Sequence, residues 1–326
     1  MAALALVGLC AVGFAGWWLS SEPPAPHVTG TSDDDLELLA RGLDAGPPPA
    51  PEHLAVDADG LYVARGNEGL VEARPRSGGA ARTLAKVGAP VGGLAAASGA
   101  VWIAAGRAVH RVPVASGPDV HVTDGLSRAG ALAVDATSVF VVDVDPGGGG
   151  LVPRSSLVRV PASGGTPVVL ARAQGEIPGV VLDESSAYFC DPLEGSVVAV
   201  PKAGGAPRVL ATDRGLPGEL VMVGDALVWV ERRSESLFAV PKAGGTPRAI
   251  TQDFAGFAHL VARGRAVAWV DEAAVDGAFR VLSVGLDGGE VAAQSPAVDG
   301  VDALASDGAR LFWLRGDEAS EVPAAD

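Results

Sequence analysis

Three residues with metal-binding side chains stand at matching places in the sequence: His53, Glu219 and His259. Each comes directly before a short apolar segment, "LAVD", "LVMV" or "LVAR". Imidazole and carboxylate ligands together suit zinc, manganese or iron, whereas calcium takes oxygen ligands. Such an ion would act as a Lewis acid in a lyase, lactonase or other hydrolase. The sequence therefore offers one hypothesis for a divalent metal, which requires the three segments to converge.

Two lysines beside glycine pairs raise a second chemistry, phosphate binding. Lys202 and Lys242 lie in "AVPKAGGAPRVLA" and "AVPKAGGTPRAIT". A phosphate-binding loop has its lysine after the glycines and opens a helix. Here Pro207 and Pro247 follow, and related turns read "PRSGG", "PASGG" and "GLDGG". We therefore interpret the glycine pairs as hairpin turns that use positive φ, with no phosphate site.

Four aspartates recur just before a turn, which admits a calcium hypothesis and a structural one. They are Asp57, Asp135, Asp183 and Asp307. No complete D-x-D-x-D-G calcium loop is present in the sequence. An aspartate at a turn entrance accepts backbone N–H groups of the turn. We expect these four carboxylates to cap turns.

Other catalytic signatures are missing from the sequence. It contains no G-x-S-x-G, H-E-x-x-H or C-x-x-C motif, so no catalytic residue is predicted and enzyme activity has no positive support. The two cysteines are Cys10, in an apolar N-terminus, and Cys190, in a strand-like segment, and no disulfide between them is expected. His110 and His121 belong to a divergent stretch, and we assign them no role.

The candidate residues belong to a repeat of roughly 40 residues, the length of one propeller blade. Its first landmark recurs at Leu54, Leu94, Leu132, Val181, Leu220, Leu260 and Leu304. The glycine turn follows at Gly78, Gly117, Gly164, Gly204, Gly244 and Gly288. Both series share one long step, which places an insertion, Asp143 to Ser156, in the third copy. The position of His53 is occupied elsewhere by Gly93, Ala131, Val180 and Ala303, so a complete ring of metal ligands is not expected.

Each copy predicts four short strands. Segments such as "LAVDATSVFVVD" and "SLVRVPASGGTPVVLA" alternate with period two and are rich in β-branched residues. Four-stranded units of this length are typical of β-propeller blades. We predict an all-β, seven-bladed propeller over residues 36–326; six or eight blades remain open if the alignment slips in the second or sixth copy.

The last copy, from Ala303, stops after its third strand. The missing strand is predicted at the other end of the chain, in "LELLARG" at Leu36–Arg41. Pairing the first and last segments in one sheet would close the ring and remove an open edge. This velcro closure is the most specific prediction about the fold.

The repeats resemble those of secreted bacterial β-propellers of the broad NHL-like and TolB-like group. The resemblance covers about Leu36 to Pro323 and is carried by units such as "LAVDATSVFVVD". It implies a propeller fold, but the group includes scaffolds, sensors, lyases and lactonases, so it does not imply one activity. The tryptophan-aspartate signature of intracellular WD repeats is absent.

Residues 1–20 form an apolar segment with no charged side chain, long enough to span a bilayer as a helix. We predict a signal anchor or a signal peptide there, although such segments normally begin with Lys or Arg and the first basic residue in this sequence is Arg41. Residues 21–35 predict a flexible linker rich in Pro, Ser and Asp. The propeller would then be extracytoplasmic, either tethered as a single-pass protein with its N-terminus inside or secreted to the periplasm.

The formal net charge of −15 disfavours nucleic-acid binding, because a negative surface repels phosphate. These observations favour a binding or scaffold module of the bacterial cell envelope, with an envelope protein or a small-molecule or glycan ligand as partner. The alternative is the metal-dependent lyase or hydrolase, with His53, Glu219 and His259 at the mouth of the central channel. A purely structural envelope protein is a third option.

Overall fold

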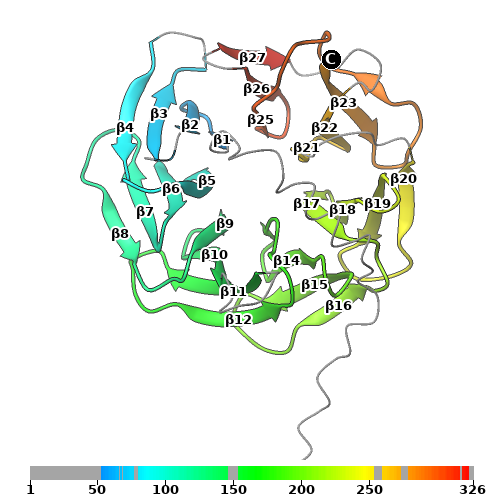
Figure 1. Cartoon of the computed structure of the whole chain (residues 1–326), viewed down its shortest axis with the longest axis horizontal. Coiled ribbons are helices and arrows are strands. Elements are labelled where there is room, and N and C mark those ends of the chain that lie inside the picture. The colour runs from blue at the N-terminus through cyan, green and yellow to red at the C-terminus, as the bar shows by residue number, and fades with distance from the viewer. Residues whose placement is uncertain are drawn as a thin grey trace, which may run out of the picture.

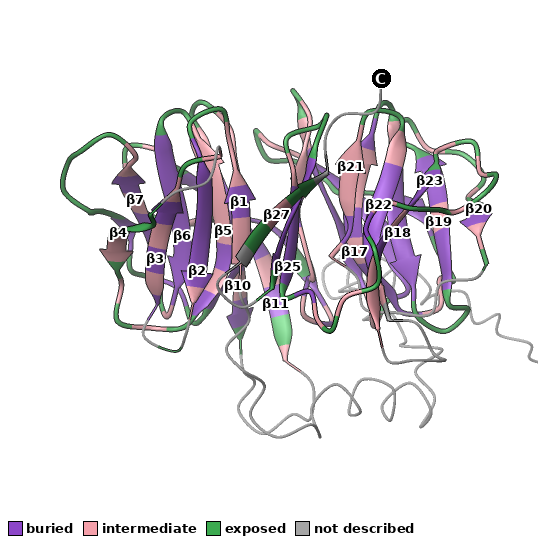
Figure 2. Cartoon of the chain, turned by 90° about the horizontal axis from the view of Figure 1, so that it is seen from above, coloured by how far each residue is buried: buried purple, intermediate pink, exposed green. Residues whose placement is uncertain are grey.

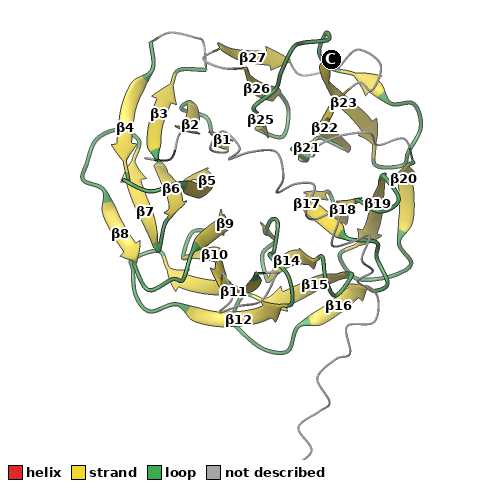
Figure 3. Cartoon of the chain, viewed as in Figure 1, coloured by secondary structure: helices red, strands yellow, loops and turns green. Residues whose placement is uncertain are grey.

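A computed structural model describes residues 53–65, 67, 69–76, 80–145, 153–252, 259–272, 278–315 and 318–322. The predicted apolar helix at 1–20, the linker at 21–35 and the closing strand Leu36–Arg41 lie outside the described residues. Every regular element in the described ranges is a β-strand (Figure 3). No helix among these residues is long and apolar enough to cross a membrane.

The strands form seven separate antiparallel sheets arranged around a central space (Figure 1). Six sheets have four strands and the seventh has three described strands, each strand pairing with its neighbour in sequence. The predicted all-β, seven-bladed propeller is confirmed. Whether Leu36–Arg41 supplies a fourth strand to the last sheet stays a prediction.

The strands are assigned to blades in chain order. Blade 1 contains β1 (His53–Val56), β2 (Leu61–Arg65), β3 (Leu70–Arg74) and β4 (Arg82–Lys86). Blade 2 contains β5 (Val91–Ala97), β6 (Ala100–Ala105), β7 (Ala108–Pro113) and β8 (Val120–Thr123). Blade 3 contains β9 (Ala129–Val134), β10 (Ser138–Asp145), β11 (Arg154–Pro161) and β12 (Val168–Ala173). Blade 4 contains β13 (Val181–Leu182), β14 (Ser186–Asp191), β15 (Ser196–Pro201) and β16 (Arg208–Ala211).

The remaining three blades follow the same order. Blade 5 contains β17 (Pro217–Val223), β18 (Ala226–Glu231), β19 (Ser236–Pro241) and β20 (Arg248–Thr251). Blade 6 contains β21 (Val261–Arg263), β22 (Ala266–Glu272), β23 (Phe279–Gly285) and β24 (Ala292–Ala293). Blade 7 contains β25 (Ala303–Ser306), β26 (Leu311–Arg315) and β27 (Glu318–Val322). The first strand of each blade lies innermost (Figure 1).

The core lies between neighbouring blades. Second strands such as β6 and β18 are buried along nearly their whole length, because both faces of each sheet are covered by the adjacent sheets (Figure 2). Trp102, Trp229 and Trp269 are among the largest fully buried side chains and occupy second strands of three blades. This two-sided burial explains why these segments are continuously apolar instead of alternating.

The insertion in blade 3, which the repeat spacing places at Asp143 to Ser156, is not a loop along its whole length. Its two ends continue the sheet, with Asp143 opposite Ser156 and Asp145 opposite Arg154. Strands β10 and β11 therefore extend further than their counterparts, and only residues 146–152 of the insertion lie outside the described ranges. The paired ends give this connection a rigid base.

The glycine turns have the conformation that the sequence predicts. Gly164, Gly204 and Gly244 have φ of 94°, 92° and 95°. Each donates its N–H to the carbonyl of the proline three residues earlier, at 2.8–2.9 Å. Positive φ is accessible to glycine without a steric penalty. Lys202 and Lys242 each lie in a turn between two strands, whereas a phosphate-binding loop leads into a helix.

The recurring aspartates cap turns, which confirms that expectation. The Asp135 Oδ1 accepts the N–H groups of Thr137 and Ser138 at 2.8 and 2.9 Å. The other three, Asp57, Asp183 and Asp307, accept the backbone N–H groups of the residues two and three positions later. These carboxylates therefore stabilise the turn between the first and second strands.

The same aspartates also join neighbouring blades, a role that the sequence analysis did not predict. Lys202 Nζ of blade 4 lies 2.8 Å from Asp135 of blade 3, and Lys242 Nζ of blade 5 lies 3.6 Å from Asp183 of blade 4. Burial opposes ionisation of Asp135, but Lys202 and the N–H donors outweigh it and lower the pKa of Asp135 to about 2. Lys202 and Lys242, which precede two of the glycine pairs, thus each form an ion pair with the preceding blade.

A third pair of this kind joins blade 7 to blade 1. The Arg76 guanidinium donates to the Asp307 carboxylate and to the Asp57 carbonyl oxygen, and lies over the ring of Phe312. The two side chains are mostly covered, with 22% and 19% of their surface exposed. This contact links the described ends of the ring.

We expect Arg76→Ala to lower the free energy of unfolding by about 1–2 kcal/mol, because it removes a charge-assisted bond and a ring contact at once. Arg310→Ala removes an ion pair within blade 7 and serves as the control, with an expected loss of about 0.5 kcal/mol or less. Urea unfolding of both variants measures the difference. Equal losses would show that Arg76 acts as an ordinary surface charge.

Candidate functional site

The residues of the metal hypothesis lie on three inner strands or at their entrances. His53 opens β1, Glu219 is the third residue of β17, and His259 lies two residues before β21. All three therefore belong to the wall around the central space in blades 1, 5 and 6 (Figure 1). The inner strands are placed as the repeat predicts.

His53 contacts the neighbouring blade. Its Nε2 donates to the carbonyl oxygen of Val91 in β5, at 2.9 Å. Burial lowers the pKa of His53 from its ordinary value, and the bond to Val91 only partly offsets this. His53 is thus a neutral imidazole near pH 7 that links blades 1 and 2.

Glu219 makes a similar link on the other side of the ring. Its carboxylate accepts the N–H of Leu260 in blade 6, at 2.8 Å. Burial raises the pKa of Glu219 to about 7, against the opposing effects of the Leu260 N–H and the Arg232 charge. Glu219 is half-buried, and the protein atoms around its carboxyl group are dense enough to oppose its ionisation. It is a carboxyl group that changes charge near neutral pH.

His259 is the member of the set that faces other titratable groups. Burial lowers the pKa of His259, the charge of His53 lowers it further, and Asp302 raises it. However, the ligand atoms of His53, Glu219 and His259 are not within 4.8 Å of one another; among the described residues, one group of three meets that limit, and it lies elsewhere. The structure therefore does not bring the three together, and a metal at this place stays a prediction.

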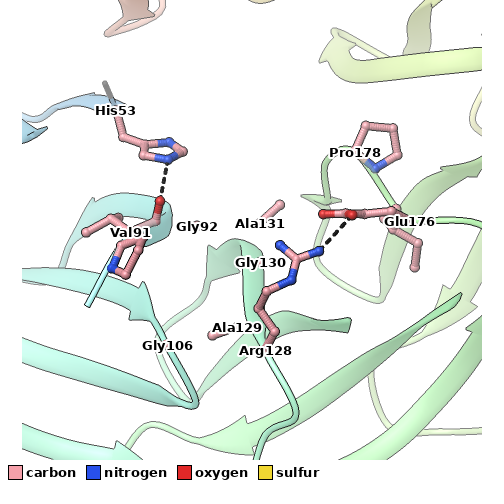
Figure 4. Close-up of a pocket in the computed structure, with 12 residues that line it drawn as sticks. His53, Val91, Gly92, Gly106, Arg128, Ala129, Gly130, Ala131, Glu176 and Pro178 are labelled. Carbon is pink, nitrogen blue, oxygen red and sulfur yellow. Dashed lines mark hydrogen bonds and ion pairs between the residues drawn. The ribbon is translucent and has the colours of Figure 1, made fainter. Parts of the chain in front are cut away.

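A pocket of about 400 Å³ opens between the inner strands of blades 1 to 4 (Figure 4). It lies on the entry face, which we define as the face where connections 124–128 and 174–180 lead into β9 and β13. Its lining residues are His53, Pro90, Val91, Gly92, Gly106, Arg128, Ala129, Gly130, Ala131, Glu176, Ile177 and Pro178. His53 is the only member of the predicted metal set among them.

An ion pair stands at the mouth of this pocket. Arg128 Nη2 lies 2.8 Å from Glu176 Oε2, and the two side chains point toward each other from the entrances of blades 3 and 4 (Figure 4). Both remain about half exposed, at 47% and 42%. A ligand can therefore reach a cation and an anion on one side of the pocket.

Carboxylates on second strands fix the connections that carry this pair. Asp143 at β10 accepts the N–H groups of Ser127 and Arg128 at 2.7 and 3.3 Å. Asp191 at β14 accepts the N–H groups of Gln174 and Gly175 at 2.8 and 3.3 Å. Both connections are held by charge-assisted bonds, so Arg128 and Glu176 project from an ordered backbone.

Glycines bring the inner strands of blades 2 and 3 unusually close at the pocket floor. A Cβ on Gly92 would lie 2.3 Å from the Ala129 carbonyl oxygen, and one on Gly93 would lie 2.8 Å from that of Gly130. Gly93 occupies the repeat position of His53, Glu219 and His259, so a metal ligand is sterically excluded there. The sequence showed the glycine but not the strand contact that requires it.

Arg128 and Glu176 were not predicted from the sequence, since neither belongs to a recurring position with unusual chemistry. A usable signal was the acid that follows the apolar part of the second strand in "VVD", "FCD" and "WVE", at Asp143, Asp191 and Glu231. This acid marks the connections that are fixed on the entry face. Asp143 also begins the blade 3 insertion, so the described start of that insertion contacts the connection that carries Arg128.

The lining contains charged, imidazole and apolar groups, but no serine, threonine, cysteine or tyrosine among the residues that the structure places there. Nucleophilic catalysis by a side-chain hydroxyl or thiol therefore has no donor in the pocket as described. The arrangement suits reversible binding, with Arg128 and Glu176 as polar contacts and Val91, Ala131 and Pro178 as apolar ones.

No protein-family model and no curated protein matches the sequence. Solved structures do match. A streptogramin B lyase aligns over 86% of this chain and 95% of its own, with 12% identity and a TM-score of 0.67. The WD40 propeller domain of Doa1 covers 86% and 94%, with 9% identity and a TM-score of 0.64. A putative TolB from Agrobacterium tumefaciens covers 66% and 83%, with 17% identity and a TM-score of 0.51. At these identities the likeness shows the propeller fold alone.

Proposed function

We propose that this propeller is a binding module that takes its ligand in the pocket between blades 1 to 4. The observation that carries the proposal is the Arg128–Glu176 pair, held by anchored connections at the mouth of a cavity of about 400 Å³. Cavities of this size with a few convergent polar groups are the usual form of small-ligand sites. The general role as a binding or scaffold propeller agrees with the TolB-like fold.

The lining indicates the chemistry of the ligand. A small molecule, or an exposed segment of a partner protein, would place a hydrogen-bonding group against Arg128 and Glu176 and an apolar part against Val91 and Pro178. His53 donates from Nε2 to Val91, which leaves Nδ1 as an acceptor. A glycan or an amide-rich group meets these requirements, because it donates and accepts hydrogen bonds without a net charge.

The proposal includes an extracytoplasmic location in a bacterial envelope. Its support is the apolar segment of residues 1–20, followed by a linker at 21–35. A tethered propeller would then present the pocket on the outer side of the membrane. Fusing a reporter that is active only outside the cytoplasm to the chain, with and without residues 1–20, tests this part. Activity in neither fusion would contradict the location, and activity in both would contradict the role of residues 1–20.

The metal-dependent lyase alternative has less support. One structural neighbour is a streptogramin B lyase, but the likeness shows the fold alone at 12% identity. The ligand atoms of His53, Glu219 and His259 do not all lie within 4.8 Å of one another, so a metal there stays a prediction. We therefore place binding ahead of catalysis.

The test is a thermal-shift screen of glycans, small amides and short peptides against the full chain. We expect compounds that raise the melting temperature to lose at least tenfold in affinity with Arg128→Ala, because that change removes the cation at the pocket mouth. Isothermal titration of each confirmed compound measures the loss.

Arg310→Ala is the control, since Arg310 forms an ion pair of similar exposure with Glu321 in blade 7, away from the pocket. This variant should bind as the unchanged chain does. Compounds that bind Arg128→Ala and the unchanged chain equally well would contradict the pocket assignment. A complete absence of binding compounds at millimolar concentration would contradict the binding function.

A further inference from the structure

A cluster of metal-binding side chains lies far from the pocket, on the two outer strands of blade 2. His110 in β7 and His121 in β8 are directly opposite each other in the strand pairing. Asp119 precedes β8 and its Oδ2 lies 2.9 Å from His110 Nδ1. One ligand atom from each of the three lies within 4.8 Å of the others, the only such group among the described residues.

The geometry of the two imidazoles brings their nitrogens to one place. The ring centroids are 4.4 Å apart and the ring planes meet at 65°. His110 is 5% exposed, whereas His121 and Asp119 are exposed. One ligand is thus fixed by the sheet, and two remain able to adjust.

The other blades provide an internal comparison. The pair that corresponds to His110 and His121 is Glu72–Thr83, Val158–Val169, Val198–Val209, Phe238–Ala249 and Leu282–Ala293 in blades 1 and 3 to 6. The residue that corresponds to Asp119 is Ala81, Pro167, Pro207, Pro247 and Val291. Apolar pairs are therefore the common solution, and neither histidine nor this aspartate is required by the fold.

Blade 2 departs from the repeat at three positions, and the three substituted side chains meet at one point. We propose that His110, Asp119 and His121 bind a transition-metal ion of the zinc class. Two imidazoles and one carboxylate form a familiar three-ligand zinc set, which leaves a fourth position for water. The net charge of −15 favours the approach of a cation.

Only small movements are needed to form the site. Ligand atoms around a tetrahedral zinc ion lie about 3.3 Å apart, given bonds of about 2.0–2.1 Å. The exposed His121 and Asp119 side chains can close from the present separation by rotation about their side-chain bonds. His110 would offer the lone pair of one ring nitrogen to the ion and carry its proton on the other. The bound ion would crosslink β7 and the edge strand β8.

Zinc binding to the full chain, purified without a histidine tag and stripped with a chelator, tests the proposal. Competition against a chromogenic zinc chelator gives the affinity and the stoichiometry. We expect one zinc ion per chain, and at least a tenfold weaker affinity in His121→Ala and in Asp119→Asn. Cobalt substitution should give the visible absorption of a four-coordinate ion, which both changes remove.

Two controls keep these results interpretable. His121 is exposed, so His121→Ala should unfold in urea at the same midpoint as the unchanged chain without metal. His259→Ala removes a histidine of the channel set and should leave zinc affinity unchanged. Unchanged zinc affinity in His121→Ala, or no zinc binding at 100-micromolar concentration, would overturn the proposal. Loss of binding in His259→Ala alone would also overturn it and would move the metal to the channel.

Discussion

Gly92→Ala is expected to lower the free energy of unfolding by about 3 kcal/mol, at the upper end of the usual cost of overpacking. The added Cβ would lie 2.3 Å from the Ala129 carbonyl oxygen and 3.0 Å from the Gly130 Cα. Both are backbone atoms of β9, so no side-chain rotation relieves the contact. The inner strands of blades 2 and 3 must separate, which also opens the floor of the pocket.

Urea unfolding measures this loss, and Gly179→Ala is its control. Gly179 lies on the connection into blade 4, and an added Cβ there meets no atom within 4 Å. We expect that variant to change stability by about 0.5 kcal/mol or less, because the added Cβ contacts no other atom. Similar stability of the two variants would mean that β5 and β9 are not in close contact in solution.

The second large effect is a pH dependence of stability that comes from Glu219. Its pKa is about 7 in the folded chain, against an ordinary value of 4.5. Between these values the folded state holds a proton that the unfolded state has released. Stability from this group is therefore complete below pH 4.5 and is lost as the pH rises to 7. The loss is about 2–3 kcal/mol, after a discount for the water that reaches the channel.

Glu219→Gln isolates this contribution, because the amide oxygen can still accept the Leu260 N–H but does not titrate. The variant should match the unchanged chain at pH 4.5 and exceed it by about 2–3 kcal/mol at pH 8. Urea unfolding across this range gives the difference in free energy of unfolding between the variant and the unchanged chain. Taking this difference cancels the contributions of His53 and His259, whose lowered pKa values make stability rise with pH. The exposed Glu184→Gln is the control for losing a carboxylate. A flat difference curve for Glu219→Gln would contradict the raised pKa.

The number and order of strands follow from periodicity alone. Leu54 and its counterparts gave the position of each first strand, and the glycine turns gave the hairpin between the third and fourth strands. Because the same pattern recurs in every copy, the strand positions of one blade can be inferred from those of the others. One divergent copy therefore has little effect on the predicted fold. The prediction was weaker in the insertion, because sequence spacing shows extra residues and does not show whether they extend strands or form a loop.

Contacts between blades were beyond the sequence analysis. The recurrence of Lys202 and Lys242 was visible, but their acid partners lie in the preceding blade, 67 and 59 residues earlier. His110 and His121 looked unremarkable for the same reason. Their alignment depends on a register shift between Val109 and His110 in the pairing of β7 and β8, which no spacing rule predicts. Arg128 and Glu176 likewise meet only when two connections face each other.

Among the described residues, the ion pairs made by the recurring aspartates are unevenly distributed around the ring. They join blades 3 to 4, 4 to 5 and 7 to 1 through the recurring aspartates. The junction of blades 2 and 3, beside the pocket, is instead closed by the glycine contacts and by the bond from the Gly165 N–H to the Val122 carbonyl. Dissolved salt screens the first kind of contact and has little effect on the second. Changes in ionic strength would therefore loosen these three junctions and leave the junction of blades 2 and 3 unchanged.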